Sequence, residues 1–285
     1  MLINKDGSVK SELLSLVRMQ GIAVLEGVEP AELNKTFQQE WVRAKDGVLR
    51  AQLGGRFPTD EELALLRDLG VTAIHINPCL QYDGTLLLGA TMKAIARRMK
   101  FTADEYTFLQ REPPTIYFLG SERLVDDDLE GIKAVPAILE ETGFTLYANY
   151  RVEADCGIWP ANESEVFKWL KRWGSYHNGW WLGRSCGVVS APLFPKPDGG
   201  MRNPNTAETV RCWLGYRPKP GYYLVVSSQP FCENQKMAVE RAVKEAGKEG
   251  YTFDVCGPEA PLLPLSRWLD NLAKQLWEEV QFLPK

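Results

Sequence analysis

Histidine is scarce in this 285-residue chain, which contains only His75 and His177. Two histidines cannot supply the usual histidine-rich metal site. The six cysteines include no C-x-x-C pair, so the usual spacing of a structural zinc site is missing. The glycine-rich signatures G-x-G-x-x-G and G-x-x-x-x-G-K-[ST] are missing too. The common zinc, dinucleotide and P-loop motifs are therefore excluded, and we expect no metal ligands.

The chain also lacks a surplus of basic residues, since its formal net charge is −4. General nucleic-acid binders usually carry such a surplus, so we expect no nucleic-acid partner. The first residues, MLINKDGSVKSELLSL, contain neither a long apolar core nor a small-residue cleavage site, which argues against a signal peptide. No run reaches the roughly 18 apolar residues that a membrane helix needs. These absences predict a cytoplasmic protein with no membrane partner and buried, reduced cysteines, and they leave its oligomeric state unknown.

What is present is an alternation of apolar runs and helical patterns after residue 114. This order predicts an α/β fold, a Rossmann-like and mostly parallel sheet with helices on both faces. The strands that we expect are 115–119, 144–150, 188–190, 222–228 and 251–255. Residues 1–113 are predicted to form a mainly helical N-terminal region, with a short strand at 71–76 and a helix at 85–100, that packs on the α/β domain of residues 114–285.

Polar residues follow several of the predicted strands, and ligands of parallel sheets bind beyond the carboxyl ends of the strands. We expect Gly120 and Ser121 to offer backbone N–H groups to a ligand, and Arg123 to balance its charge. The alternative is a plain turn with a surface Glu-Arg pair. After the strand at 222–228 we place three further ligand-binding candidates, Ser227, Ser228 and Gln229.

Glu153 and Asp155 lie two residues apart after the predicted strand at 144–150. In an extended segment both side chains would point to the same side. We take them as the catalytic candidates, with Glu153 as a general base or as the group that binds a ribose hydroxyl. The alternative is a solvated pair of loop carboxylates.

Asn205-Thr206-Ala207-Glu208 stands directly before a predicted helix and has the pattern of a capping box. Helix N-termini also bind anions through the same free N–H groups and the local dipole. Asn205 and Thr206 are therefore candidate ligand donors, with Arg202 adding positive charge. Both interpretations, a plain cap and an anion site, stay open at this point.

Gly183-Arg184-Ser185-Cys186-Gly187 matches the G-x-S-x-G pattern of a nucleophile elbow. An elbow is followed by a helix, whereas VVSAPLFPKP follows here. Both histidines also precede the serine, while α/β-hydrolases place theirs after it. We therefore do not expect a Ser-His-Asp hydrolase.

Four pieces of the sequence occur in a familiar order: Leu119-Gly120-Ser121, Glu153-Ala154, Asn205-Thr206-Ala207-Glu208 and Val226-Ser227-Ser228. Over about residues 114–280 this order resembles the bacterial YdcF/SanA/ElyC-like family. The resemblance implies a Rossmann-like fold that binds a nucleotide-like or S-adenosylmethionine-like ligand, with poorly defined reactions. The family's histidine and arginine would fall near Phe231 and Asn234, so the resemblance carries the fold over better than the activity.

These features predict an enzyme, a transferase or hydrolase, that binds a small anionic molecule at the strand ends. The alternative is a non-catalytic module that senses a ligand or binds a protein partner. Nine tryptophans keep that alternative open, because surface tryptophan is enriched at interfaces. Exposure of Trp180 and Trp181 would support the module, and burial beside a deep polar cleft would support the enzyme.

Overall fold

The computed structural model describes residues 1–42, 54–70, 74–126, 130, 135–142, 145–146, 160–175, 180–260 and 263–283. The chain divides into two compact units. Unit 1 comprises Met1–Ala73, Gln229–Ala238 and Glu259–Lys285, and unit 2 comprises Ile74–Ser228 and Val239–Pro258. This division differs from the boundary expected after residue 113, because the sheet already begins at Gly84.

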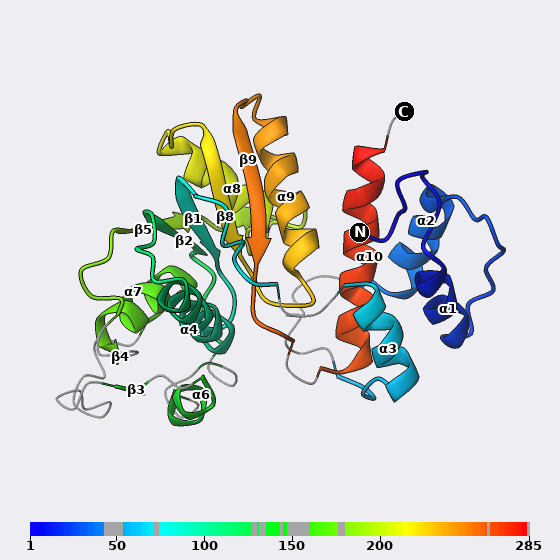
Figure 1. Cartoon of the computed structure of the whole chain (residues 1–285), viewed down its shortest axis with the longest axis horizontal. Coiled ribbons are helices and arrows are strands. Elements are labelled where there is room, and N and C mark those ends of the chain that lie inside the picture. The colour runs from blue at the N-terminus through cyan, green and yellow to red at the C-terminus, as the bar shows by residue number, and fades with distance from the viewer. Residues whose placement is uncertain are drawn as a thin grey trace. The chain divides into compact units, whose positions relative to one another are not determined.

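Unit 2 is built on a central sheet in which all neighbouring strands are parallel (Figure 1). Its strands are β1 (Gly84–Leu88), β2 (Ile116–Ser121), β5 (Cys186–Ala191), β8 (Gly221–Val226) and β9 (Tyr251–Cys256), in the spatial order β5-β2-β1-β8-β9. Counted along the chain this is the order 3-2-1-4-5, the strand order typical of Rossmann folds. The predicted Rossmann-like α/β fold is confirmed, and the direction of strand addition reverses between β1 and β8.

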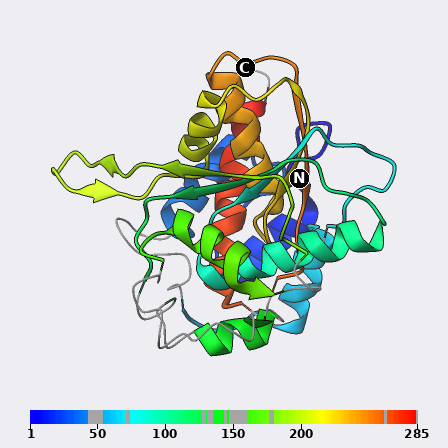
Figure 2. The same cartoon turned by 90° about the vertical axis from the view of Figure 1, so that its left-hand side faces the viewer.

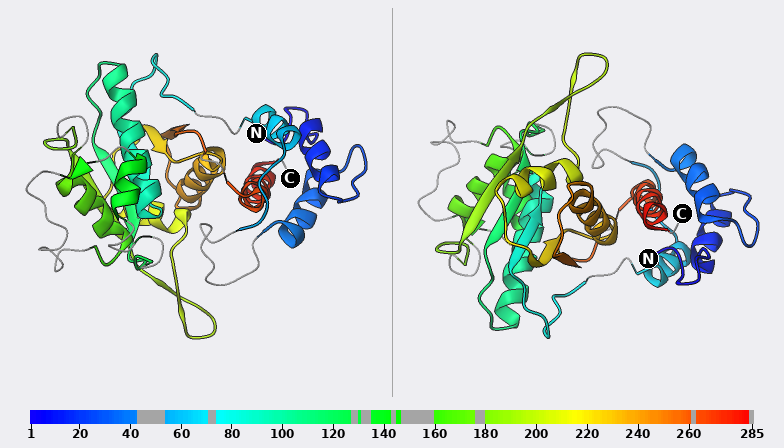
Figure 3. Two further views of the ribbon diagram at one scale, coloured as in Figure 1. Left: turned by 90° about the horizontal axis from the view of Figure 1, so that it is seen from below. Right: turned by 90° about the horizontal axis from the view of Figure 1, so that it is seen from above.

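Helices cover both faces of this sheet, as the alternation of side chains along β2 shows. Phe118 stacks on Phe167 of α7 (Glu163–Trp173), with ring centroids 4.8 Å apart. The preceding residue, Tyr117, instead meets Trp213 of α8 (Thr206–Gly215) edge-on at 6.0 Å. The helix α4 (Met92–Phe108) contacts both β1 and α7, and Figure 3 shows α4 and α7 on one side of the sheet. Two further described helices are α6 (Val135–Thr142) and α9 (Cys232–Glu245). The first turns of α9 belong to unit 1 and the rest of it to unit 2.

The helix expected at 85–100 is wrong at its start. Residues Gly84–Leu88 form β1, in which every residue is buried, and the helix begins only at Met92. A short run of leucines does not distinguish a strand from a buried helix by periodicity, so the pattern favoured the wrong element. The central strand of the sheet was therefore missed, together with the residues that follow it.

Two small antiparallel sheets lie outside the central one. The strand β3 (Thr145–Leu146) pairs with β4 (Gly174–Ser175), so the described part of the run expected at 144–150 does not join the central sheet. The other positions of that run, 144 and 147–150, lie outside the described residues, as do 71–73 of the strand expected at 71–76. The strands β6 (Phe194–Pro195) and β7 (Met201–Arg202) form a hairpin that extends away from the sheet (Figure 2).

Unit 1 is helical and draws its elements from both ends of the chain. It contains α1 (Ser11–Met19), α2 (Pro30–Glu40), α3 (Asp60–Asp68) and α10 (Leu265–Phe282). The side chains of Leu13, Phe37 and Leu276 are fully buried in one apolar cluster of this unit. The Glu279 carboxylate of α10 accepts hydrogen bonds from the backbone N–H groups of Leu2 and Ile3, which anchors the N-terminal segment on the last helix.

Membrane-spanning helices are not found in the part of the chain that the structure describes: none of its helices is both long enough and apolar enough to cross a bilayer. The 18-residue helix α10 is long enough, but it carries charges such as Asp270, Lys274 and Glu278 within its span.

Candidate functional site

The carboxyl ends of β1 and β8 are held together by Arg98, a buried residue of α4. Its Nη1 donates to the carbonyl oxygens of Leu88, at 2.7 Å, and Gly89, at 3.0 Å. Its Nε donates to Ser228 Oγ at 3.0 Å, and its Nη2 reaches Ser227 Oγ at 3.4 Å. These contacts lie where the direction of strand addition reverses, the place at which open parallel sheets bind their ligands.

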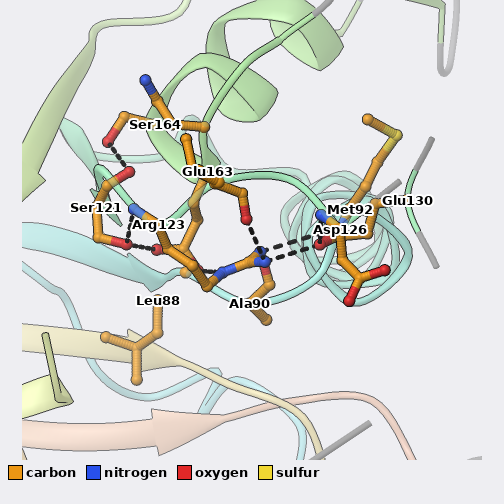
Figure 4. A network of polar contacts seen from close by, with 12 residues as sticks. Leu88, Ala90, Met92, Ser121, Arg123, Asp126, Glu130, Glu163 and Ser164 are labelled. Atoms are coloured by element: carbon orange, nitrogen blue, oxygen red, sulfur yellow. Dashed lines mark hydrogen bonds and ion pairs between the residues drawn. The ribbon is translucent and has the colours of Figure 1, made fainter. Parts of the chain in front are cut away.

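A second buried arginine, Arg123, follows β2 and forms a two-pronged ion pair with Glu130 (Figure 4). The distances are 2.8 Å from Nη1 to Oε2 and 3.2 Å from Nη2 to Oε1. Arg123 Nη2 also donates to the carbonyl of Ala90 at 2.9 Å. The Glu130 carboxylate accepts further bonds from the backbone N–H groups of Met92 and Asp126. The carboxylate therefore sits at the N-terminus of α4, beside the end of β1.

Glu163, the first residue of α7, completes this polar cluster. Its Oε2 accepts a 2.6 Å hydrogen bond from Ser121 Oγ, and its Oε1 lies 3.7 Å from Arg123 Nε. Burial raises the pKa of the Glu163 carboxyl above its ordinary value, because the opposing charge of Arg123 and the Ser121 bond do not fully compensate. For Arg123, burial lowers the pKa, but the bond to Glu130 and the nearby carboxylates raise it overall.

Two glycines allow α7 to approach the strand ends. A Cβ placed on Gly89 would lie 2.6 Å from the carboxylate carbon of Glu163. A Cβ on Gly120 would lie 2.8 Å from Ser164 Oγ and 2.9 Å from Ser164 Cα. Gly120 is thus part of β2 and packs against α7, rather than forming a turn after the strand.

The predicted capping box at Asn205 is confirmed. Asn205 Oδ1 accepts from the Glu208 N–H at 3.0 Å, and the Glu208 carboxylate accepts from the Asn205 N–H at 2.8 Å. Arg202 donates to both oxygens of the same carboxylate. This ion pair and the Asn205 bond hold the pKa of Glu208 below its usual value despite partial burial. Thr206 is half-buried in the first position of α8.

The same arrangement occurs a second time, at the start of α3 in unit 1. There Thr59 is the N-cap, Glu62 completes the capping box, and Arg56 pairs with both Glu62 oxygens. The Arg56 bond, with weaker help from the Thr59 N–H, lowers the pKa of Glu62 to about 2. Both helices therefore begin with one local pattern, R-x-P-[TN]-x-x-E. Since every described strand of the central sheet comes after α3 in the chain, this pattern needs no ligand to explain it.

The remaining predicted site residues fall into two groups. Gln229 is buried, belongs to unit 1, and its Nε2 lies 3.5 Å from the Gly70 carbonyl oxygen. The catalytic candidates Glu153 and Asp155 lie outside the described residues, so their roles stay predictions. The structure thus brings Ser121 and Arg123 together in one cluster, with Gly120 beside them, and Ser227 and Ser228 together at Arg98.

Sequence analysis missed Arg98, Glu130 and Glu163, all of which are buried charges. Charged residues are almost never buried without partners, but burial is not visible in a sequence. One signal was available: Glu163 is the first residue of a strongly amphipathic helix.

Two other predictions from the sequence can be placed. Trp181 is buried in the core and Trp180 is half-buried with its ring 4.8 Å from that of Trp181. In the G-x-S-x-G segment, Ser185 Oγ lies 3.3 Å from Thr115 Oγ1, and Cys186 begins the strand β5. A strand follows the serine where an elbow would have a helix, in agreement with the prediction that this is not a nucleophile elbow.

Within the described ranges, no group of three or more His, Cys, Asp or Glu side chains is arranged to hold a metal ion. Searches of family models, curated proteins and solved structures find no match to this chain. The candidate site therefore rests on its own geometry, and the YdcF/SanA/ElyC-like resemblance stays a prediction.

Proposed function

We propose that this protein binds a small anionic molecule of the nucleotide or S-adenosylmethionine type at the carboxyl ends of β1, β2 and β8, and acts on it as a transferase or hydrolase. The observation that carries the proposal is the buried guanidinium of Arg123 at the N-terminus of α4. In Rossmann folds the helix that follows the first strand receives the phosphate groups of the ligand. Arginine offers a planar pair of donors that matches a phosphate or carboxylate.

Each charged residue of the cluster has a distinct role in this proposal. Arg98 positions the ends of β1 and β8 through their carbonyl groups and the Ser227 and Ser228 hydroxyls. Arg123 supplies the positive charge. Glu163 is the proton-transferring group, because its raised pKa brings its titration closer to neutral pH, as general acid–base catalysis requires.

A non-catalytic ligand-sensing module is the second candidate, and one observation favours it. The Arg123 guanidinium already donates to Glu130, Ala90 and Leu124, so the cluster also serves as a structural network. Such networks perturb pKa values without any catalysis. The partner-binding alternative loses one of its grounds, because Trp181 is buried.

The first experiment is a thermal-stability screen of the full chain against nucleotides, S-adenosylmethionine and sugar phosphates. A ligand present at about 100 times its dissociation constant stabilises the folded state by roughly 2.7 kcal/mol, a readily measured shift. We expect Arg123→Met to abolish the shift. The matched control is Arg56→Met, which removes an arginine with the same two-pronged glutamate pairing in unit 1.

Two outcomes would contradict the proposal: no ligand in the panel shifts the wild-type protein, or both arginine variants respond like the wild type. If Arg123→Met does not fold, Arg123→Lys keeps the charge but loses the paired geometry, and a weakened shift is then expected. Turnover of a bound ligand that Glu163→Gln abolishes, with binding retained, would separate the enzyme from the sensing module.

A further inference from the structure

The start of α4 differs from the starts of α3 and α8. The helices α3 and α8 are capped locally, by Thr59 and Asn205 together with a glutamate three positions later. In α4, which the structure describes completely, the N-cap residue Thr91 makes no side-chain cap bond and the first turn has no acidic residue. This helix start therefore receives its negative charge from elsewhere.

That charge is the Glu130 carboxylate, which comes from 38 residues beyond Met92. Four donors from two separate segments, the start of α4 and the stretch that follows β2, converge on it. They are the Met92 N–H at the helix start, the Asp126 N–H, and both terminal nitrogens of Arg123 (Figure 4). The Glu130 side chain is completely buried and the Arg123 side chain is 9% exposed. A single anion is thus held from several sides in a site that is largely shielded from water.

This set of donors has the composition of a phosphate site. A helix N-terminus, a neighbouring backbone N–H and an arginine with two parallel donors are the groups that proteins use to bind phosphate oxygens. The location of these donors also agrees with a phosphate site. The helix α4 follows β1, the strand after which the direction of strand addition reverses. In Rossmann folds the pyrophosphate of the ligand lies at this helix.

We infer that Glu130 is an internal stand-in for a phosphate group, and that a ligand phosphate binds at the N-terminus of α4 by displacing the Glu130 carboxylate. This inference rests on the proposed function. It specifies that the ligand binds through a phosphate group and that the Glu130 carboxylate competes with this group for the same donors. The carboxylate and a phosphate cannot share the Met92 N–H and the Arg123 donors. The structure therefore represents the closed state, and the apparent affinity for a ligand includes the cost of releasing Glu130.

The test uses inorganic phosphate and pyrophosphate as probes on the full chain. Glu130→Ala removes the competitor and leaves its donors in place. We expect phosphate or pyrophosphate to raise the melting temperature of Glu130→Ala in a saturable way, with an affinity at least about tenfold above that of the wild type, a ratio that corresponds to about 1.4 kcal/mol. Adding Arg123→Met should remove this gain.

The matched control is Glu62→Ala. Glu62 is also buried, and it also receives an arginine pair and a backbone N–H, but within the local cap of α3. An equal gain in Glu62→Ala would overturn the inference, since phosphate would then be filling any vacated arginine pair. No gain in Glu130→Ala over the wild type would overturn it as well.

Glu130→Gln covers the case in which Glu130→Ala does not fold, because it keeps the shape and removes the charge. It should bind the probes more tightly than the wild type; equal binding contradicts the stand-in role. The two proposals fail differently. If the wild type binds a nucleotide through Arg123 and the Glu130 variants bind it no better, only the stand-in fails. If neither the wild type nor any Glu130 variant binds a probe or a panel ligand, both fail.

Discussion

Gly89 lacks a side chain because the Glu163 carboxylate occupies the space where a Cβ would stand. The candidate site is defined by such contacts between individual residues rather than by a sequence motif. Glu163 lies against Gly89, receives the Ser121 hydroxyl and faces Arg123. Each of these residues constrains the position of the others, so single substitutions should have large and non-additive effects.

Gly89→Ala should destabilise the protein by about 1–3 kcal/mol, because the added methyl group must push the buried carboxylate aside. Urea unfolding measures the loss. In the background of Glu163→Ala the same substitution should cost much less, because the clash is gone. Gly215→Ala is the control, since a Cβ at that position, the last residue of α8, meets nothing within 4 Å. Equal effects of Gly89→Ala in both backgrounds would contradict the packing described here.

The two buried glutamates Glu62 and Glu163 should affect the pH dependence of stability with opposite signs. The pKa of Glu62 is about 2 in the folded protein and 4.5 ordinarily, so its contribution is present above pH 4.5 and is lost as pH falls toward 2. The pKa of Glu163 is raised, so its contribution is present below pH 4.5 and is lost as pH rises through the folded value.

Free energies of unfolding measured against pH for the wild type, Glu62→Gln and Glu163→Gln test this pair of signs. The difference between wild type and Glu62→Gln should grow from pH 2 to 4.5 and then level off. The difference between wild type and Glu163→Gln should decline as pH rises above 4.5. If both differences grew as pH rises, the Glu163 carboxyl would be stabilised in its charged form, contrary to the burial effect.

At the scale of elements, the starts of three helices show two ways to satisfy the same free N–H groups. The local pattern R-x-P-[TN]-x-x-E caps α3 and α8, and a distant carboxylate serves α4. The local pattern can form as soon as the helix forms. The cap that Glu130 supplies to α4 can form only when β2 and the loop after it are in place, because Arg123 of that loop holds the Glu130 carboxylate.

Alanine at the three N-cap positions should therefore have unequal effects. Thr59→Ala and Asn205→Ala should each cost about 0.5–2 kcal/mol, because each removes a side-chain bond to a backbone N–H. Thr91→Ala should cost clearly less, because that hydroxyl makes no cap bond in the fully described helix α4. Chemical denaturation of the three variants provides the comparison. A cost at Thr91 as large as at Asn205 would contradict the assignment of the α4 cap to Glu130.

For the whole molecule, the assignment of elements to the two units does not follow chain order. The last helix, α10, belongs to the same unit as the first 73 residues, and its Leu272 and Leu276 lie in the core that contains Leu33 and Phe37. The helical region expected at 1–113 is thus completed by a segment from the opposite end of the chain.

Leu276→Ala should destabilise unit 1 by about 2–5 kcal/mol and should be felt most at the N-terminal helices. Amide hydrogen exchange is the measurement, and we expect the largest loss of protection in α1 and α2. Gln281→Ala, at an exposed position of the same helix, is the control. Unchanged exchange in α2, which packs on α10, would contradict this arrangement.

The chain alone determined the strands and helices whose patterns are long and regular. The parallel α/β fold follows from the regular alternation of strands and helices and the Asn205 cap from a local pattern, and both were predicted correctly. The strand β1 was missed because five buried residues carry too little periodicity to identify a strand.

Which polar groups meet at the strand ends is set by the three-dimensional packing of the chain. The four buried charges come from three separate parts of the chain, and no spacing in the sequence relates them. Arg98 belongs to α4, Glu163 opens α7, and Arg123 and Glu130 lie between β2 and α6. Their pairing depends on the strand order β5-β2-β1-β8-β9, which sets which chain segments become neighbours. Local propensity acts over a few residues, whereas the desolvation that makes these charges depend on one another arises only when the whole sheet and its helices have closed around them.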